Sequence, residues 1–257
     1  MLVLETALAH EHDATDGRAG HAHPLTLLRL PGYRAGMAEP PELIIFDLDG
    51  TLVDSRRDLA DALNHARVGF GLPPLDVETV SAFVGDGVRI LIERAFATTD
   101  PNVVEAALAA FRPYYGAHCL DHTRLYPDVR ETLATLPVRA LAVLTNKPEA
   151  FARTILEGLE VGSRFVAVIG GDSGPMRKPD PAGVHEILRR TGVAPARAVL
   201  VGDSTIDLGA ARAAGVRAGL VGWGFGREAD LRAARPDFFL RRFADLPAAL
   251  GLAGPRS

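Results

Sequence analysis

Short apolar runs alternate with longer stretches of helical period from residue 43 to about residue 250. Most of the runs are apolar throughout rather than at every second position, which is typical of parallel strands covered by helices on both faces. The pattern predicts strands at residues 43–46, 140–144, 165–169, 198–201, 218–221 and 238–240, and helices near residues 128–136, 148–158, 181–191 and 205–214. The sequence therefore predicts an α/β fold with a mainly parallel sheet.

The stretch from residue 55 to residue 125 breaks this alternation, because only helical periods occur in it. Apolar residues recur at three- and four-residue spacings within residues 59–70, 88–96 and 104–115, and we interpret these stripes as core faces rather than ligand-binding faces. A block inserted after the first strand lies near that strand's carboxyl end, where α/β sheets bind ligands. We therefore predict a Rossmann-like, doubly wound core formed by residues 43–54 and 126–250, with an inserted all-helical cap domain at residues 55–125.

Residues 1–36 follow neither pattern. They contain four histidines and no sustained period, and the histidines have no neighbouring cysteine and no zinc-finger spacing. We interpret this segment as a disordered tail or as an extension upstream of the true translation start. In the second case we expect translation to begin at Met37.

Composition limits the classes of partner. The 28 basic and 32 acidic residues give a net charge of −4, which provides no basic field for nucleic acid or an anionic membrane. No apolar run approaches the roughly 20 residues that span a bilayer. The single cysteine, Cys119, cannot form an intramolecular disulfide, which fits a reducing cytoplasm. The sequence leaves open whether the protein is a monomer or a homodimer.

Two aspartates follow the first predicted strand in the segment Asp47-Leu48-Asp49-Gly50-Thr51. In extended backbone Asp47 and Asp49 point to the same side, and neighbouring buried carboxylates need a cation or a proton between them. An isolated Asp-Gly pair is more simply a solvated turn. Three more polar segments follow in order, each of which alone is typical of a turn, a helix cap or exposed backbone. These are Thr145-Asn146-Lys147-Pro148, Arg177-Lys178-Pro179-Asp180-Pro181 and Gly202-Asp203-Ser204-Thr205-Ile206-Asp207.

The four segments, in this order, resemble the four motifs of the haloacid dehalogenase superfamily. The resemblance implies that Asp47 is a nucleophile and that Asp49 is an acid and base. It also implies that Thr145 and Lys178 bind the transferring phosphoryl group and stabilise its charge, with Asn146 beside them as a further substrate-binding residue.

The resemblance also implies a magnesium site. A carboxylate that attacks a phosphate dianion is repelled by it unless a hard cation with oxygen ligands lies between them. The implied ligands are the side chains of Asp47 and Asp203 and the backbone carbonyl of Asp49, with Asp207 supporting them.

Residues 84–89 and 170–181 resemble the corresponding segments of phosphoglycolate phosphatases. The implied activity is magnesium-dependent hydrolysis of a small phosphate monoester, 2-phosphoglycolate, to glycolate and phosphate through an aspartyl-phosphate. Arg89 is a candidate for binding the glycolate carboxylate, although a solvated position on a helix surface explains it more simply.

Three alternatives to this activity remain at this stage. A sugar-phosphate phosphatase or a β-phosphoglucomutase would use the same motifs, and a non-catalytic binding module could keep the fold. Asp49 argues against carbon–halogen cleavage, since members with that activity generally lack an acid at this position.

Overall fold

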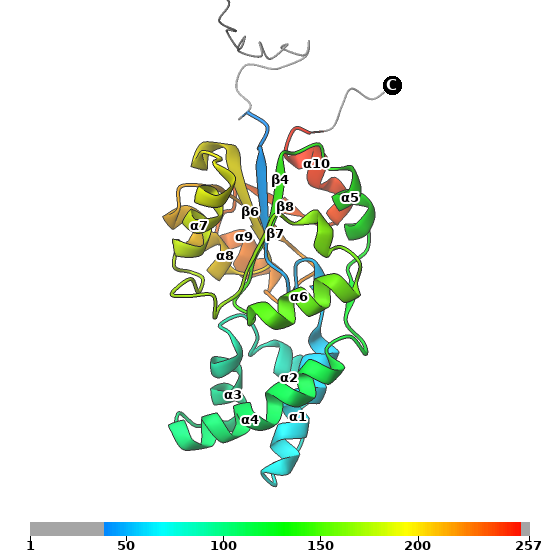
Figure 1. Cartoon of the computed structure of the whole chain (residues 1–257), viewed down its shortest axis with the longest axis vertical. Coiled ribbons are helices and arrows are strands. Elements are labelled where there is room, and N and C mark those ends of the chain that lie inside the picture. The colour runs from blue at the N-terminus through cyan, green and yellow to red at the C-terminus, as the bar shows by residue number, and fades with distance from the viewer. Residues whose placement is uncertain (1–38, 253–257) are drawn as a thin grey trace, which may run out of the picture. The chain divides into compact units, whose positions relative to one another are not determined.

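The computed structural model describes residues 39–252, so the expectations for residues 1–36 and for Met37 lie outside the described residues. Six parallel strands form one sheet (Figure 1). In spatial order they are β5 (Ala167–Ile169), β4 (Ala140–Leu144), β1 (Leu43–Phe46), β6 (Ala198–Gly202), β7 (Arg217–Val221) and β8 (Phe238–Leu240). The predicted fold class is confirmed. Only β5 is clearly shorter than predicted, because a 3₁₀ turn at Gly162–Arg164 precedes it and Val166 is 64% exposed.

Alternate residues of β1 enter two different cores, as the pleat of a strand requires. Ile44 and Phe46 pack on one face, whereas Leu43 and Ile45 pack on the other, and all four are fully buried. The first face is covered by α5 (Val129–Thr135), α6 (Glu149–Gly158) and α10 (Leu246–Ala249). The second face is covered by α7 (Ala182–Thr191), α8 (Thr205–Ala213) and α9 (Glu228–Ala233). Helices therefore cover both faces of the sheet, as in a doubly wound fold (Figure 1).

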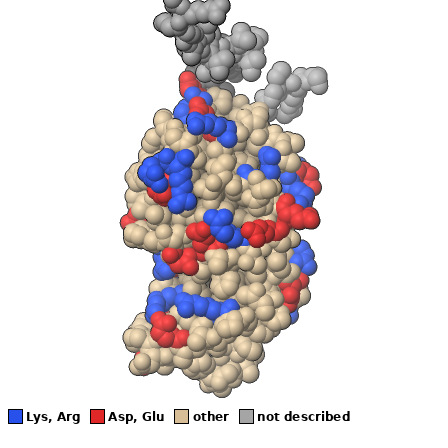
Figure 2. Space-filling model, viewed as in Figure 1, with Lys and Arg blue, Asp and Glu red and all other residues tan. Residues whose placement is uncertain are grey.

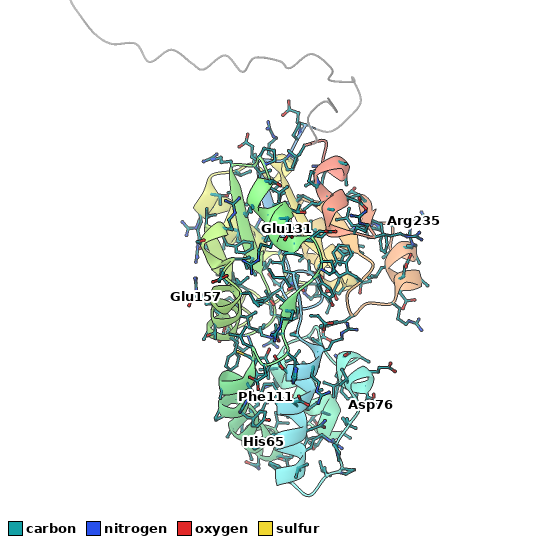
Figure 3. The ribbon with its side chains drawn as sticks, turned by 90° about the vertical axis from the view of Figure 1, so that its right-hand side faces the viewer. His65, Asp76, Phe111, Glu131, Glu157 and Arg235 are labelled. Carbon is teal, nitrogen blue, oxygen red and sulfur yellow. The ribbon has the colours of Figure 1, made fainter. Side chains whose placement is uncertain are left out.

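Residues 55–125, which we call the helical insertion, contain four helices. These are α1 (Arg56–Gly69), α2 (Val77–Ser81), α3 (Val88–Phe96) and α4 (Pro101–His118). The exposed Asp76 caps α2 by accepting a hydrogen bond from the backbone N–H of Thr79, whereas Phe111 of α4 is buried (Figure 3). Whether the insertion is a separate domain stays a prediction.

The apolar stripes of the insertion serve two purposes. Leu63, Val104 and Leu108 are buried, as predicted for core faces. However, Leu91 and Phe111 also line a cavity, so the interpretation of these stripes as core faces alone is wrong. One helix face can therefore contribute side chains both to the core of the insertion and to the wall of the cavity.

A short antiparallel pair joins the two ends of the insertion and was not predicted. β2 (Val53–Asp54) pairs with β3 (Arg124–Leu125), and the backbone N–H of Tyr126 donates to the carbonyl of Leu52 at 3.0 Å. Two residues are too few to show a period, which is why the pattern missed them. The chain therefore leaves the sheet and returns to it through adjacent strands.

Charged side chains of both signs are intermixed on the surface shown in Figure 2. Many of them form exposed ion pairs within one helix, such as Arg189 with Glu186. Such pairs contribute about 0–1 kcal/mol each, so they do not determine the fold. Among the described helices, none combines the length and apolar character needed to cross a membrane.

Candidate active site

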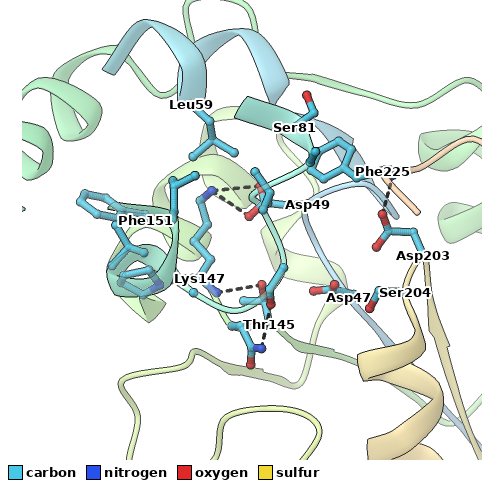
Figure 4. Close-up of a pocket in the computed structure, with 18 of the residues that line it drawn as sticks. Asp47, Asp49, Leu59, Ser81, Thr145, Lys147, Phe151, Asp203, Ser204 and Phe225 are labelled. Carbon is cyan, nitrogen blue, oxygen red and sulfur yellow. Dashed lines mark hydrogen bonds and ion pairs between the residues drawn. The ribbon is translucent and has the colours of Figure 1, made fainter. Parts of the chain in front are cut away.

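A cavity of about 230 Å³ lies between the carboxyl ends of the central strands and the helical insertion (Figure 4). β1 lies between β4 and β6 in the sheet, so the residues that follow these three strands meet at one edge. The core contributes Asp47, Asp49, Thr145, Asn146, Lys147, Pro148, Phe151, Asp203, Ser204, Phe225 and Gly226 to the lining. The insertion contributes Leu59, Ser81, Ala82, Val84, Gly85, Gly87, Val88, Leu91, Phe111 and Tyr115.

Three carboxylates lie together on the sheet side of the cavity. Asp47, Asp203 and Asp207 each place an oxygen within 4.8 Å of the others. Burial raises the pKa of Asp203 well above its ordinary range, and the neighbouring Asp47 and Asp207 raise it further. Burial also raises the pKa of Asp47 to about 6, although the Lys178 ammonium opposes the shift. A hard divalent cation would relieve this repulsion, and carboxylate oxygens are the ligands that it prefers.

Backbone groups fix two of these carboxylates. The N–H of Phe225 donates to Oδ2 of Asp203 at 2.7 Å. Asp207 accepts hydrogen bonds from the backbone N–H and the hydroxyl of Ser204, which forms the N-terminal cap of α8. The backbone of Gly50 passes so close to Asp203 that a Cβ there would lie 2.1 Å from Oδ2.

Lys178 balances part of the negative charge. Its ammonium lies 2.9 Å from Oδ1 of Asp47 and 2.7 Å from Oδ1 of Asp207. Burial lowers the pKa of Lys178, but the two carboxylates raise it by more, so the side chain stays charged. Asn146 holds the Lys178 backbone, since it accepts from the N–H at 2.8 Å and donates to the carbonyl at 3.0 Å.

The Asp49 carboxylate points towards Lys147 and away from Asp203 (Figure 4). Both of its carboxylate oxygens accept hydrogen bonds from the Lys147 ammonium at 2.9 Å, and the Ser55 hydroxyl donates to Oδ1 at 2.6 Å. Thr145 is also buried at the cavity, where its Oγ1 accepts a hydrogen bond from the backbone N–H of Lys147. The Thr145 hydroxyl hydrogen can therefore point to a bound phosphoryl group.

The family model of haloacid dehalogenase-like hydrolases matches residues 44–221. The chain belongs to this family. It is 39% identical over 215 residues to Phosphoglycolate phosphatase 1 of Pseudomonas aeruginosa, covering 80% of this chain and 78% of that protein. It is 41% identical over 195 residues to the phosphoglycolate phosphatase of Rhodospirillum rubrum, covering 72% and 81% of the two chains. The predicted resemblance is thus confirmed.

Solved structures agree with this membership. A crystal structure of a predicted phosphoglycolate phosphatase from Haemophilus somnus superimposes with a TM-score of 0.77 at 33% sequence identity. The match covers 80% of this chain and 96% of that one. The sheet and the helical insertion of this haloacid dehalogenase-like hydrolase therefore have a counterpart in a known structure.

The structure brings most of the predicted site residues of this haloacid dehalogenase-like hydrolase together, but not Arg89. Arg89 is 42% exposed on α3, where it forms ion pairs with Glu93 at 3.9 Å and with Glu105. It is not among the residues that line the cavity. Asn146 does line the cavity, but its amide is engaged with backbone groups of Lys178 and Gly85. Asn146 therefore links the core to the insertion, and its contact with substrate stays a prediction.

Lys147 and Ser55 are the residues that reasoning from sequence missed. Lys147 lies in the segment after β4 that contains Thr145 and Asn146, and the sequence pattern predicts no role for it. The period-2 direction of a strand is lost at its end, so the sequence could not show that Lys147 turns towards Asp49. Its position directly after two site residues was the available signal.

Proposed function

We propose that this haloacid dehalogenase-like hydrolase is a magnesium-dependent phosphatase that converts 2-phosphoglycolate to glycolate and phosphate. The observation that supports this proposal most directly is that two carboxylates with different surroundings line the same cavity. Asp47 faces a cluster that suits a cation, whereas Asp49 lies apart from that cluster with its own ammonium partner. Two carboxylates in different surroundings suit the roles of nucleophile and proton carrier.

In the first half of the reaction, a carboxylate oxygen of Asp47 attacks phosphorus. The bond between phosphorus and the ester oxygen breaks, and the departing alkoxide takes a proton from Asp49. Thr145 lines the cavity and Lys178 contacts the nucleophile Asp47, so we assign both to holding the phosphoryl oxygens while charge shifts onto the leaving group. The product of this half is glycolate, with an aspartyl-phosphate on Asp47.

In the second half, Asp49 takes a proton from water as that water attacks the same phosphorus. The bond between phosphorus and the Asp47 oxygen breaks, so phosphate leaves and the carboxylate is regenerated. Magnesium, held by Asp47, Asp203 and the Asp49 carbonyl with Asp207 in support, would supply positive charge that offsets repulsion between nucleophile and phosphate. The acidic cluster fits this ion through its hard oxygen donors and through the raised pKa values of Asp47 and Asp203.

The lining of the cavity supports a small acid rather than a sugar phosphate. The insertion presents apolar side chains to it, among them Leu59, Leu91 and Phe111, and Ser81 is one of its few polar groups. A sugar would bring several hydroxyl groups against this wall, and each would lose hydrogen bonds to water that the wall does not replace. Glycolate brings one carboxylate, and the lining residues that the structure describes include one cation, Lys147, that can pair with it. The relatives named phosphoglycolate phosphatase support the same substrate. A cytoplasmic location is part of this proposal, since the free Cys119 suits a reducing compartment.

A phosphate-release panel tests the proposal. The purified full chain is assayed with and without Mg²⁺ on 2-phosphoglycolate, glucose 1-phosphate, glucose 6-phosphate, a nucleoside monophosphate and p-nitrophenyl phosphate. We expect Mg²⁺-dependent release, with the highest kcat/KM on 2-phosphoglycolate. Higher kcat/KM on a sugar phosphate would reject the proposed substrate, and isomerised phosphosugar without free phosphate would indicate a mutase. No release from any ester would reject phosphatase activity.

A further inference from the structure

The proposed phosphoryl transfer uses Lys147 only as the ion-pair partner of Asp49. Of the 28 lysine and arginine residues in the chain, Lys147 and Lys178 are the only lysines. Both are buried at this site, with side-chain exposures of 4% and 2%. Lys178 contacts the nucleophile Asp47, whereas Lys147 contacts Asp49, which faces the leaving group in the proposed reaction. The two ammonium groups therefore serve different ends of the substrate.

Lys147 is the cation available to the part of the substrate beyond the phosphoryl group. Among the described residues that line the cavity, it is the one with a positive charge, whereas Lys178 contacts Asp47 and Asp207 and is not part of the lining. The Lys147 ammonium is 4.7 Å from the ring centroid of Tyr115, and the nearby wall includes Leu59 and Phe151 (Figure 4). In the proposed reaction Asp49 carries a proton when the ester binds, so the Lys147 ammonium beside it is then not neutralised by that carboxyl group. An ammonium in such an apolar wall attracts an anion, because little water screens its charge.

We infer that the Lys147 ammonium binds the carboxylate of the leaving group and so selects phosphate esters of small hydroxy acids over esters of uncharged alcohols. This inference rests on the proposed function, because it assumes that Asp49 protonates the ester oxygen. In 2-phosphoglycolate one methylene joins that oxygen to the carboxylate. A substrate whose ester oxygen reaches Asp49 therefore brings its carboxylate next to the cation that Asp49 already holds.

An ammonium group has enough hydrogen-bond donors for Lys147 to contact Asp49 and the substrate carboxylate at the same time. Lys147 has three N–H donors, and its hydrogen bonds to Asp49 go to two oxygens of one carboxylate. Ser55 holds the same carboxylate from another side, so Asp49 keeps a partner if Lys147 turns partly to the substrate. Lys147 would thus bind substrate and also position Asp49. These two roles have different kinetic signatures.

The test compares two substrates of matched size, 2-phosphoglycolate and 2-hydroxyethyl phosphate, which carries an alcohol in place of the carboxylate. We expect the wild type to favour 2-phosphoglycolate in kcat/KM by about 100-fold, as a buried charge-assisted contact provides. Lys147→Met should reduce this preference to about threefold or less, through a higher KM for 2-phosphoglycolate. Any change in kcat caused by the altered Asp49 should be shared by both substrates.

Two further variants support the comparison. Lys147→Arg keeps the charge and should retain a larger preference than Lys147→Met. Arg153→Met removes a cation that pairs with Glu149 on α6 outside the cavity lining, and it should leave the preference unchanged. If Lys147→Met does not fold, as judged by circular dichroism, Lys147→Gln replaces it.

The outcomes separate this inference from the proposed function. Equal losses of kcat/KM on both substrates in Lys147→Met would overturn the inference and leave Lys147 as a positioning residue for Asp49. A wild type that hydrolyses both esters equally well would reject 2-phosphoglycolate as the favoured substrate, and the role of Lys147 with it.

Discussion

The ammonium of Lys178 lies 2.9 Å from Oδ1 of Asp47, and the Lys178 side chain is only 2% exposed. Asp207 contacts the same ammonium. Removing one member of a buried ion pair leaves its partner with an uncompensated charge, which costs far more than the loss of an exposed pair. Both the stability of the folded site and its proposed chemistry therefore depend on Lys178.

Lys178→Met should lower the free energy of unfolding by about 3–5 kcal/mol in the absence of divalent cations. Urea unfolding followed by circular dichroism measures this change. Arg189→Met provides the control, because it breaks an exposed pair with Glu186 and should cost less than about 1 kcal/mol. Similar losses in the two variants would show that Asp47 and Asp207 are not left unpaired without Lys178.

Asp47→Asn should reduce kcat by about 1,000-fold or more, because the amide cannot act as a nucleophile. Phosphate release with Mg²⁺ measures the effect, and thermal unfolding confirms that the variant is folded. Asp121→Asn makes the same substitution at an exposed side chain that pairs with His118, and it should keep wild-type activity. Activity retained in Asp47→Asn would remove the aspartyl-phosphate from the mechanism.

The acidic cluster should make stability depend on pH and on Mg²⁺. Burial raises the pKa of Asp47 in the folded protein to about 6, from an ordinary value of 3.8. The folded protein thus binds this proton more tightly than the unfolded chain, and stability is lost as pH rises through that interval. Asp203, whose pKa burial also raises, acts in the same direction.

Because Mg²⁺ offsets the repulsion of ionised carboxylates, it should raise Tm by about 5 °C at pH 8 and by clearly less at pH 5. Differential scanning calorimetry at constant ionic strength measures both values. Asp203→Asn should weaken the effect of Mg²⁺ at pH 8. An equal rise in Tm at the two pH values would contradict binding by these carboxylates.

Gly50→Ala should impair the site more than an equivalent change elsewhere. Gly50 has a φ of +81°, and an added Cβ would lie 2.1 Å from Oδ2 of Asp203. Gly215 has a similar φ of +69° with no atom near the added Cβ, so Gly215→Ala reports the backbone strain alone, about 1 kcal/mol. We expect a larger loss of stability and a loss of activity only in Gly50→Ala, as measured by urea unfolding and phosphate release. Matching losses would show that Asp203 moves aside freely.

Most strands of the sheet were predictable because helices cover both of its faces, so each of these strands appears in the sequence as a continuous apolar run. β1, β4 and β8 have the predicted bounds, since their side chains enter the cores on either face. β2 and β3 were not predictable, because two residues show no period and their pairing joins positions far apart in the chain. Sequence patterns thus predict which segments are buried better than they predict which strands pair with each other.

The site was predictable where its residues belong to motifs at strand ends. Asp47, Thr145 and Asp203 meet because β1, β4 and β6 are neighbours in a parallel sheet. The direction of a side chain beyond a strand end depends on tertiary packing, and this hid the contact of Lys147 with Asp49. The same uncertainty made Arg89 attractive as a substrate ligand, although its nearest anions are Glu93 and Glu105.

The pairing of β2 with β3 has a consequence for how such enzymes can diversify. Since Val53 faces Leu125 across this pair, both ends of the helical insertion are fixed at one place on the core. The register of the six-stranded sheet involves none of the residues between them, although Ser55 within this stretch holds Asp49. A graft that keeps residues 53–55 and 124–125 is therefore expected to exchange the wall facing the leaving group while Asp49 retains its Ser55 partner.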